Sequence, residues 1–272
     1  MPADPQTSSL TERILRQDRR LLIALLTLLF GISALYTVLG VGMNMTALEM
    51  TAMSGMRDMP GGTDPGAWSA HYLILVFLMW WAMMVAMMLP SVAPTALLYG
   101  QLMRRSQVGR DRAKLQVMAF VGGYLLSWGA FSLAATVAHW GGETLGVVSA
   151  TMMTFIHTGP GGLLLICAGL FQFSGLKERC LQYCQSPVAI LTRFFRPGPY
   201  GALQLGLRHG VYCLGCCWAL MVLLFVGGVM NLYWITALAA YVALEKLTPF
   251  GRQVSKLAGV ALIFWGGFVL LS

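Results

Sequence analysis

GVYCLGCCWALMVLLFVGGVMNLYWITALAAYVAL, residues 210–244, is a run of 35 residues without a charged side chain. As one α-helix it would be about 52 Å long, too long for the ~30 Å hydrocarbon core of a bilayer. Two spans joined by a tight turn near Gly227, Gly228 and Asn231 fit the run better, with Asn231 as a turn or cap residue. The stretch therefore predicts a membrane protein whose helices reverse direction at this turn.

The composition of the 272-residue chain supports this prediction. Hydrophobic residues make up 57% of the chain and charged residues only 10%, which is typical of a polytopic membrane protein. The net charge of +8 would suggest nucleic acid for a soluble protein, but here the basic residues lie between apolar runs. We therefore expect membrane lipid as a partner and no nucleic acid. The chain has no phosphate-binding loop, which argues against ATP-driven pumping by this chain alone.

The apolar runs predict an all-α transmembrane helix bundle of about seven spans. The expected organisation is a cytoplasmic N-terminal tail at 1–20, a first span at 21–42, an extracytoplasmic methionine-rich loop at 43–67, and a bundle at 68–272 that includes a cytoplasmic, cysteine-bearing loop at 177–208. Within the bundle, spans are expected in 68–99, 115–138 and 158–176, twice in 210–244, and in 257–271. With the N-terminus inside, 17 of the 18 Lys and Arg residues are cytoplasmic and only Arg57 is outside, so we predict an N-in, C-out topology.

Sulfur-containing side chains form three groups in this topology. In the outer loop they are Met43, Met45, Met50, Met53, Met56 and Met59. Within the membrane, they recur along one broad side of a single helix, at Met79, Met83, Met84, Met87 and Met88. Toward the cytoplasm, two short motifs with helical spacing contribute Cys180 and Cys184, and then Cys213, Cys216 and Cys217.

These ligand types favour a soft metal ion. Cytoplasmic thiols stay reduced, so metal binding or redox exchange is expected of the five cysteines in place of disulfides. Thiolates together with thioethers favour Cu(I), whereas four thiolates alone could form a tetrahedral Zn site. If the two cysteine motifs share one ion, their sulfurs must lie within about 4 Å of each other. We predict that Cys180 or Cys184 approaches the turn at 213–217 this closely.

Packing is the competing interpretation for several of these residues. Methionine is an adaptable core side chain, so Met79, Met83 and Met87 could fill space as readily as bind a metal. We expect these three to face the bundle interior, toward the fifth span and Met221, if they form a relay. Cys167 is expected to be a small apolar residue of the fourth span. The Glu245–Lys246 pair, at the end of the sixth span, suggests an adjacent charge pair or a snorkelling terminus.

Three blocks of this sequence resemble a bacterial family of predicted metal-binding integral membrane proteins, catalogued as a domain of unknown function. The blocks are MWWAMMVAMMLPSVAP (79–94), AGLFQFSGLKERCLQYCQSP (168–187) and GLRHGVYCLGCCWALMVLLFVGGVMNLYW (206–234), followed by Glu245–Lys246. The resemblance extends from about Trp68 to the C-terminus. Gly175 and Gln185 stand where the family pattern has Pro and Arg. The resemblance implies metal binding and a location in the bacterial cytoplasmic (inner) membrane.

The function we predict is Cu(I) binding and transfer between the outer methionine loop and the inner cysteines. The five cysteines would form the thiolate site and the five methionines of 79–88 an intramembrane relay. No catalytic or organic-cofactor site is predicted; Zn is a possible alternative metal, and a membrane protein or a metal chaperone is a possible partner. Two other hypotheses remain: a non-catalytic scaffold or assembly subunit, whose Gly122–Gly123, Gly227–Gly228 and Gly266–Gly267 allow close helix approach, and a membrane thiol oxidoreductase.

Overall fold

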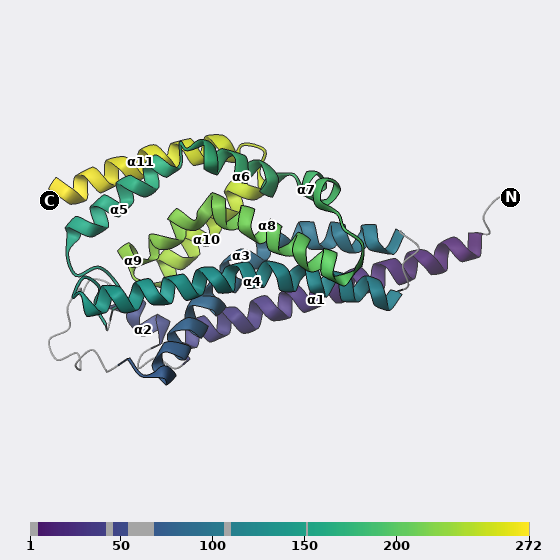
Figure 1. Cartoon of the computed structure of the whole chain (residues 1–272), viewed down its shortest axis with the longest axis horizontal. Helices are drawn as coiled ribbons and strands as arrows, with labels where there is room; N and C mark the ends of the chain where they lie inside the picture. The colour runs from purple at the N-terminus through teal and green to yellow at the C-terminus, as the bar shows by residue number, and fades with distance from the viewer. Residues whose placement is uncertain (1–4, 42–45, 54–67, 106–109, 151, 272) are drawn as a thin grey trace.

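The computed structural model describes residues 5–41, 46–53, 68–105, 110–150 and 152–271, and it shows a helical bundle (Figure 1). The helices are α1 (Pro5–Leu39), α2 (Ala47–Ala52), α3 (Ala70–Arg105), α4 (Arg110–Thr144), α5 (Thr158–Phe171), α6 (Gly175–Gln185), α7 (Pro187–Phe194), α8 (Gly198–Val222), α9 (Leu224–Gly227), α10 (Leu232–Leu247) and α11 (Gly251–Leu271). Among the described residues, extended pairing is limited to a single bridge between Val148 and Phe155. The predicted all-α fold is confirmed.

Several of these helices are suited to crossing a membrane. Within the described ranges, five segments are long and apolar enough: Arg20–Leu39, Ala70–Arg104, Arg112–Thr144, Gly198–Gly227 and Gly251–Leu271. The consecutive helices α5 and α6, bent by 65°, make a sixth if they count as one span. The 16 residues of α10 are fewer than the ~20 of a full crossing. Membrane insertion follows from these lengths and compositions, while seven spans and the N-in orientation stay predictions.

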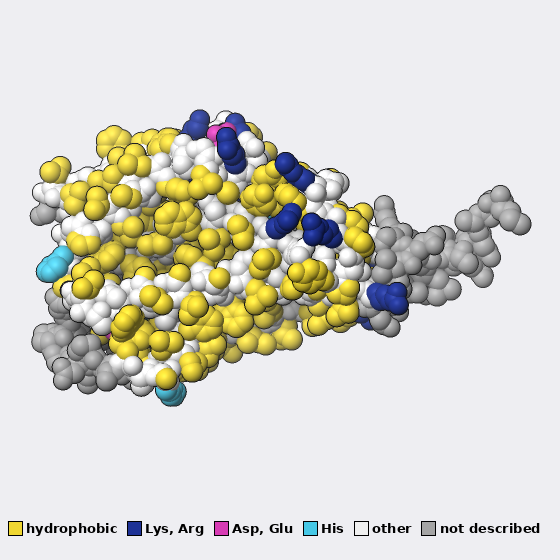
Figure 2. Space-filling view, in the orientation of Figure 1, with side chains coloured by type: hydrophobic (Ala, Val, Ile, Leu, Met, Phe, Trp, Pro, Cys, Tyr) yellow, Lys and Arg dark blue, Asp and Glu magenta, His cyan; other side chains and the backbone are white. Residues whose placement is uncertain are grey.

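The surface of the bundle separates apolar from charged side chains. Hydrophobic atoms cover most of the visible face, and the Lys and Arg side chains gather over the end that contains α6 and α7 (Figure 2). Phe264, Phe268 and Leu271 of α11 are at least 70% exposed, an arrangement that suits lipid better than water. The two ends of the described chain lie at opposite ends of the bundle (Figure 1).

The break within 210–244 lies where the sequence predicts it. The chain leaves α9 at Gly228, whose φ of +93° is a conformation that glycine adopts without steric cost. Asn231 then caps α10, because its side chain accepts hydrogen bonds from the N–H groups of Tyr233 and Trp234. The Thr51 hydroxyl of α2 accepts a further hydrogen bond, of 2.9 Å, from the Leu232 N–H. The predicted turn and the predicted role of Asn231 are confirmed.

The helices extend beyond the apolar runs that the sequence analysis marked as spans. Segment 177–208, expected as a loop, consists largely of α6, α7 and the first turns of α8. Ser174 caps α6 by accepting from the Lys177 N–H, and Pro187 stands at the start of α7, where its missing N–H costs nothing. Charged residues end a hydropathy run but not a helix, since Lys, Arg and Glu are good helix formers.

The outer methionine loop is only partly described. Its helix α2 begins with a capping box in which Glu49 accepts a 2.8 Å hydrogen bond from the Thr46 N–H. The hydrogen bonds from Thr46 hold the pKa of the Glu49 carboxyl below its ordinary value. Met50 is buried in the core, so it packs and does not face the outside. Four other methionines of the loop lie outside the described residues: Met43, Met45, Met56 and Met59.

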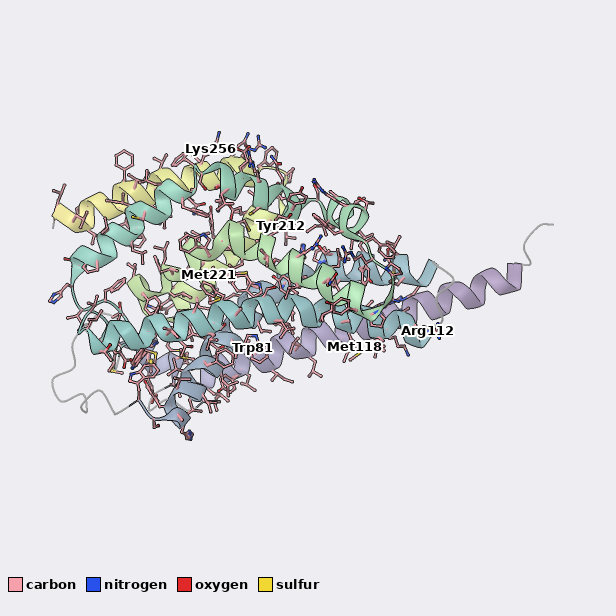
Figure 3. The ribbon with its side chains drawn as sticks, viewed as in Figure 1. Trp81, Arg112, Met118, Tyr212, Met221 and Lys256 are labelled. Carbon is pink, nitrogen blue, oxygen red and sulfur yellow. The ribbon has the colours of Figure 1, made fainter. Side chains whose placement is uncertain are left out.

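Glycines bring α4 and α8 into close contact. A Cβ added to Gly123 of α4 would overlap the backbone of Leu203 and Leu207 in α8, while one added to Gly206 would overlap the backbone of Phe120. Side chains fill the rest of the interior: Met221 of α8 is fully buried, whereas Met118 and Lys256 point outward (Figure 3). The glycine contacts therefore fix the position of the helix that carries three of the five cysteines.

Two adjacent glycines test this contact. We expect Gly123→Ala to destabilise the protein by about 1–3 kcal/mol, because the backbones of α4 and α8 must separate to admit a methyl group. Gly122→Ala should leave stability unchanged or slightly raised, since nothing lies within 4 Å of its added Cβ. Thermal unfolding of both variants in the same detergent measures the difference. Equal stability of the two variants would contradict the close contact.

Candidate metal centre

Helix α8 presents three cysteines on one face. Cys213, Cys216 and Cys217 are spaced by one helical turn and are at most 1% exposed. The thiols of Cys216 and Cys217 both donate to the carbonyl oxygen of Cys213, at 3.0 Å. The three sulfurs are therefore packed together inside the bundle, away from water.

Helix α6 brings the other cysteine motif against this face. The Sγ atoms of Cys184 and Cys216 are 3.8 Å apart. Cys180 packs on Gly215, where an added Cβ would lie 2.7 Å from its Sγ, so a larger residue at 215 would push the two helices apart. Sulfurs bound to one ion at about 2.3 Å must lie within about 4 Å of each other, a limit that the Cys184–Cys216 pair already meets. The predicted approach of the two motifs is confirmed.

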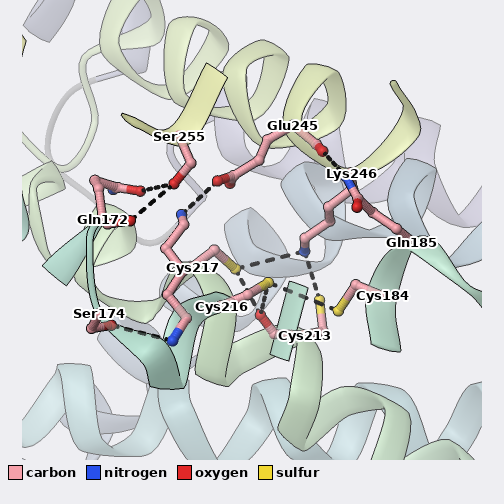
Figure 4. A network of polar contacts seen from close by, with 11 residues as sticks. Gln172, Ser174, Cys184, Gln185, Cys213, Cys216, Cys217, Glu245, Lys246 and Ser255 are labelled. Atoms are coloured by element: carbon pink, nitrogen blue, oxygen red, sulfur yellow. Dashed lines mark hydrogen bonds and ion pairs between the residues drawn. The ribbon is translucent and has the colours of Figure 1, made fainter. Parts of the chain in front are cut away.

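A lysine ammonium lies among these sulfurs. Lys246 Nζ is 2.9 Å from Cys213 Sγ and 3.7 Å from Cys217 Sγ (Figure 4). It is also 3.9 Å from Met88 Sδ. Lys246 is only 6% exposed. Its expected role as a snorkelling terminus is therefore wrong: the side chain points into the bundle because the sulfurs and not the solvent supply its partners.

Glu245, the neighbour of Lys246, faces a different partner. Its carboxylate pairs with Lys177 of α6 at 2.7 Å, and both side chains are at most 1% exposed. Glu245 and Lys246 therefore do not form an adjacent charge pair: each binds a separate group on a separate helix. Gln185 adds hydrogen bonds from its Nε2 to the carbonyl oxygens of Glu245 and Thr248, at 2.8 and 3.3 Å. These contacts tie the cysteine-bearing helix α6 to the end of α10.

The five methionines of α3 all lie inside the bundle. Met79, Met83, Met84, Met87 and Met88 are at most 4% exposed, so the expectation that Met79, Met83 and Met87 face the interior is confirmed. That they face Met221 stays a prediction. Helix α3 packs chiefly on α1 and α4 and also contacts α10. Met88 and the α8 cysteines meet at Lys246 of α10, which makes α10 the link between the methionines and the thiols.

The sequence analysis missed two residues at this site, a tyrosine and a histidine. The hydroxyl of Tyr124 lies 3.1 Å from Cys213 Sγ. His209, one turn before Cys213, is 2% exposed and packs against the rings of Tyr124 and Phe120. The spacing His-x3-Cys was visible in the sequence, whereas the contact from Tyr124 depends on how α4 packs on α8.

A second set of buried polar side chains, separate from the cysteines, lies around His139 and Glu143 of α4. His139 Nε2 is 3.0 Å from Glu143 Oε1, and Trp68 Nε1 donates to Glu143 Oε2 at 2.8 Å. Trp80 Nε1 approaches His139 Nδ1 at 3.5 Å, a long contact for a hydrogen bond. The helical spacing of His139 and Glu143, four residues apart, is the signal that could have revealed this pair.

Cys184 lies at the border between the cluster and the basic end of the bundle. It is partly exposed, whereas the α8 cysteines are not. Next to it, the rings of Tyr183 and Tyr212 stack at 4.4 Å, and Arg193 donates to the Tyr183 hydroxyl at 2.6 Å. Cys184 is therefore the most accessible cysteine of the cluster.

The cysteines are reduced and do not form a ready-made coordination site. All six described cysteines are free, and Cys167 lies apart on the exposed side of α5. In the part of the chain that the structure describes, no three Cys, His, Asp or Glu side chains stand in an arrangement that holds a metal ion as it is. Two thiols in contact and two more beside them make a set that needs side-chain rotation, not refolding, to surround an ion.

Comparison with known families bears on what this cluster handles. A sequence model of the PpoB2 family, described as a copper chaperone, matches residues 77–269. The chain belongs to this family of copper chaperones. The matched region extends from α3 to α11 and includes the five methionines, both cysteine motifs and Lys246. The comparisons with curated proteins and with solved structures give no match.

The buried Lys177–Glu245 pair should contribute more to stability than a surface pair of equal length. Removing one partner leaves an uncompensated buried charge, so we expect Lys177→Met alone to cost about 3–5 kcal/mol. The double variant Lys177→Met, Glu245→Gln should cost less than Lys177→Met alone, because it leaves neither charge. Unfolding in detergent measures these differences as a double-mutant cycle.

The pair Glu178–Arg252, also 2.7 Å long but about half exposed, is the control. Glu178→Gln should cost no more than about 1 kcal/mol, because solvent screens this pair. Additive effects of the two substitutions at 177 and 245 would show that the buried pair has no special role.

Proposed function

We propose that the chain binds Cu(I) at the cluster of Cys184, Cys213, Cys216 and Cys217, beside Cys180, and passes it to or from the methionines of α3. The observation that carries the proposal is the 3.8 Å separation of Cys184 Sγ and Cys216 Sγ, which joins two distant motifs at one place. Membership of a copper chaperone family supports copper as the cargo.

The ligand chemistry supports the cuprous ion. Thiolates and thioethers are soft ligands that select Cu(I) over hard cations. Zn remains the alternative, because four cysteines could surround it tetrahedrally. Met88 and Cys213 contact the same ammonium, that of Lys246, so a thioether lies at the border of the thiolate cluster. This arrangement favours Cu(I), because a thioether ligand suits copper and hardly suits zinc.

The methionines of α3 are suited to a relay by their placement. All five belong to one helix and are buried in the bundle, and Met88 adjoins the cysteine cluster. From Met79 to Met88 the helix rises about 14 Å, so the methionines alone cannot cross a bilayer. The outer methionine loop would have to complete the route at the other end. Weak thioether ligands suit transfer, because an ion that moves must also be released.

The cysteines would lie at the cytoplasmic side of a bacterial inner membrane. The Lys and Arg side chains over α6 and α7 support this orientation, since basic residues concentrate on the cytoplasmic side (Figure 2). The same basic surface, beside the partly exposed Cys184, would suit an acidic metal chaperone or a partner membrane protein.

The scaffold hypothesis has less support. In the glycine pairs proposed as surfaces for partner helices, Gly123 and Gly266 contact helices of this same chain, α8 and α5. Gly122 and Gly267 remain open, with nothing within 4 Å of an added Cβ. Single open glycines offer a partner helix little surface. The thiol oxidoreductase hypothesis is distinguished by experiment: it requires a Cys184–Cys216 disulfide that forms and is reduced during turnover.

Removing the thiols that meet should abolish copper binding. We expect the double variant Cys184→Ser, Cys216→Ser to lose stoichiometric Cu(I) after loading under reducing conditions, because a hydroxyl is a poor ligand for a soft ion. Elemental analysis and X-ray absorption of the purified protein measure the copper content and the sulfur coordination. Cys167→Ser, on the exposed side of α5, should bind as the wild type does. Undiminished copper in the double variant would exclude this site.

The methionine relay has its own test. Met83→Leu with Met87→Leu should preserve folding, since such swaps usually cost less than about 1.5 kcal/mol. Copper transfer across vesicles should nevertheless fall, because leucine offers no sulfur. Met118→Leu, at a 67% exposed position of α4, is the matched control and should transfer normally. Normal transfer by the double variant would leave packing as the role of these methionines.

A further inference from the structure

Lys246 occupies the junction between the two groups of sulfur ligands. Its ammonium is within 4 Å of two thiols of α8 and of Met88, the methionine of α3 that adjoins the cluster. Lysine carries a compact positive charge at the end of a flexible stem. A single positive charge therefore already occupies the place where the proposed route passes from thiolate to thioether ligands.

This position conflicts with a bound metal ion. An ion bonded to Cys213 and Cys217 at about 2.3 Å would lie in the space between their sulfurs, which Lys246 Nζ faces from 2.9 and 3.7 Å. Two positive charges at such a distance in a dry interior repel each other strongly. The ion and the ammonium cannot both hold these two sulfurs.

We propose that Lys246 is an internal competitor of Cu(I). In the metal-free state its ammonium neutralises the sulfur cluster, and it withdraws when Cu(I) takes Cys213 and Cys217. No electron is transferred: the ammonium leaves with its charge, and the proton of the Cys217 thiol, which donates to the Cys213 carbonyl in the metal-free state, is released to solvent when that sulfur binds Cu(I). The consequence is a weaker, more readily released Cu(I) than the same sulfurs would hold without the lysine.

The pair Cys184–Cys216 makes the exchange physically reasonable. These two sulfurs are already in contact, and the contacts of Lys246 that the structure shows are with Cys213, Cys217 and Met88. An arriving ion can bind Cys184 and Cys216 first, while the ammonium still holds the deeper sulfurs. Withdrawal of Lys246 then opens Cys213, Cys217 and Met88 together, which places the ion at the end of the methionine series.

A second role for the lysine predicts the opposite result. If Lys246 served only to keep the cysteines charged and ready to bind, its loss would weaken Cu(I) binding. If it competes, its loss strengthens binding. The direction of the change in affinity therefore decides between the two roles.

The test compares Cu(I) affinity and release at one pH. We expect Lys246→Leu, which removes the charge without adding a sulfur ligand, to bind Cu(I) at least tenfold more tightly than wild type, with slower release to a competing chelator. Lys246→Gln should do the same, and it serves if the leucine variant fails to fold. Lys246→Arg should retain weak, fast exchange because it keeps the charge.

Controls separate this inference from the proposed function on which it rests. Lys256→Gln removes one positive charge from an exposed position and should leave affinity unchanged. Wild-type protein that binds no Cu(I) would refute the proposed function and this inference together. Wild-type binding with equal or weaker binding in Lys246→Leu and Lys246→Gln would refute the competitor alone.

Discussion

The buried ion pair between Lys177 and Glu245 holds α6 against α10 by a direct contact of 2.7 Å. Charges taken out of water must be paired, so this contact leaves little freedom in how the two helices meet. The register that it fixes places Cys184, two turns along α6 from Lys177, beside Cys216. On α10 it turns the next residue, Lys246, toward α8. The geometry of the cysteine cluster therefore depends on the Lys177–Glu245 ion pair, although neither residue is a sulfur ligand.

Much of the fold could be predicted from the sequence because it is encoded locally. The charge-free run of 210–244 was too long for one span, and Gly228 and Asn231 provide the turn that divides it. Helix ends were less predictable. Hydropathy marks the part of a helix that suits lipid, whereas α6 is a polar helix stabilised by its Ser174 cap and by contacts with α8 and α10.

The site was predictable only as far as spacing allows. Cys213, Cys216 and Cys217 had to share a helical face, and their contact with Cys184 followed from the topology. The roles of Lys246 and Glu245 could not be read from the sequence, since adjacent residues of a helix point about 100° apart and either could have faced solvent. Only the way α6 and α8 pack on α10 gives Glu245 an ammonium partner, Lys177, and gives Lys246 its sulfur partners. Burial of the methionines was predictable, but packing and ligation both require it, so burial alone does not decide between them.

A cation held among soft ligands also bears on selectivity. Hard cations such as Na⁺ or Mg²⁺ gain little from sulfur and would still have to displace the ammonium of Lys246 from the cluster. A soft ion gains strong bonds to thiolates, which offset the cost of that displacement. The lysine therefore penalises hard and soft cations of the same charge alike, while the sulfurs favour only soft ones. Selectivity then rests on the difference between the free energy gained from sulfur bonds and the cost of displacing Lys246. It needs no cavity shaped to one ionic radius.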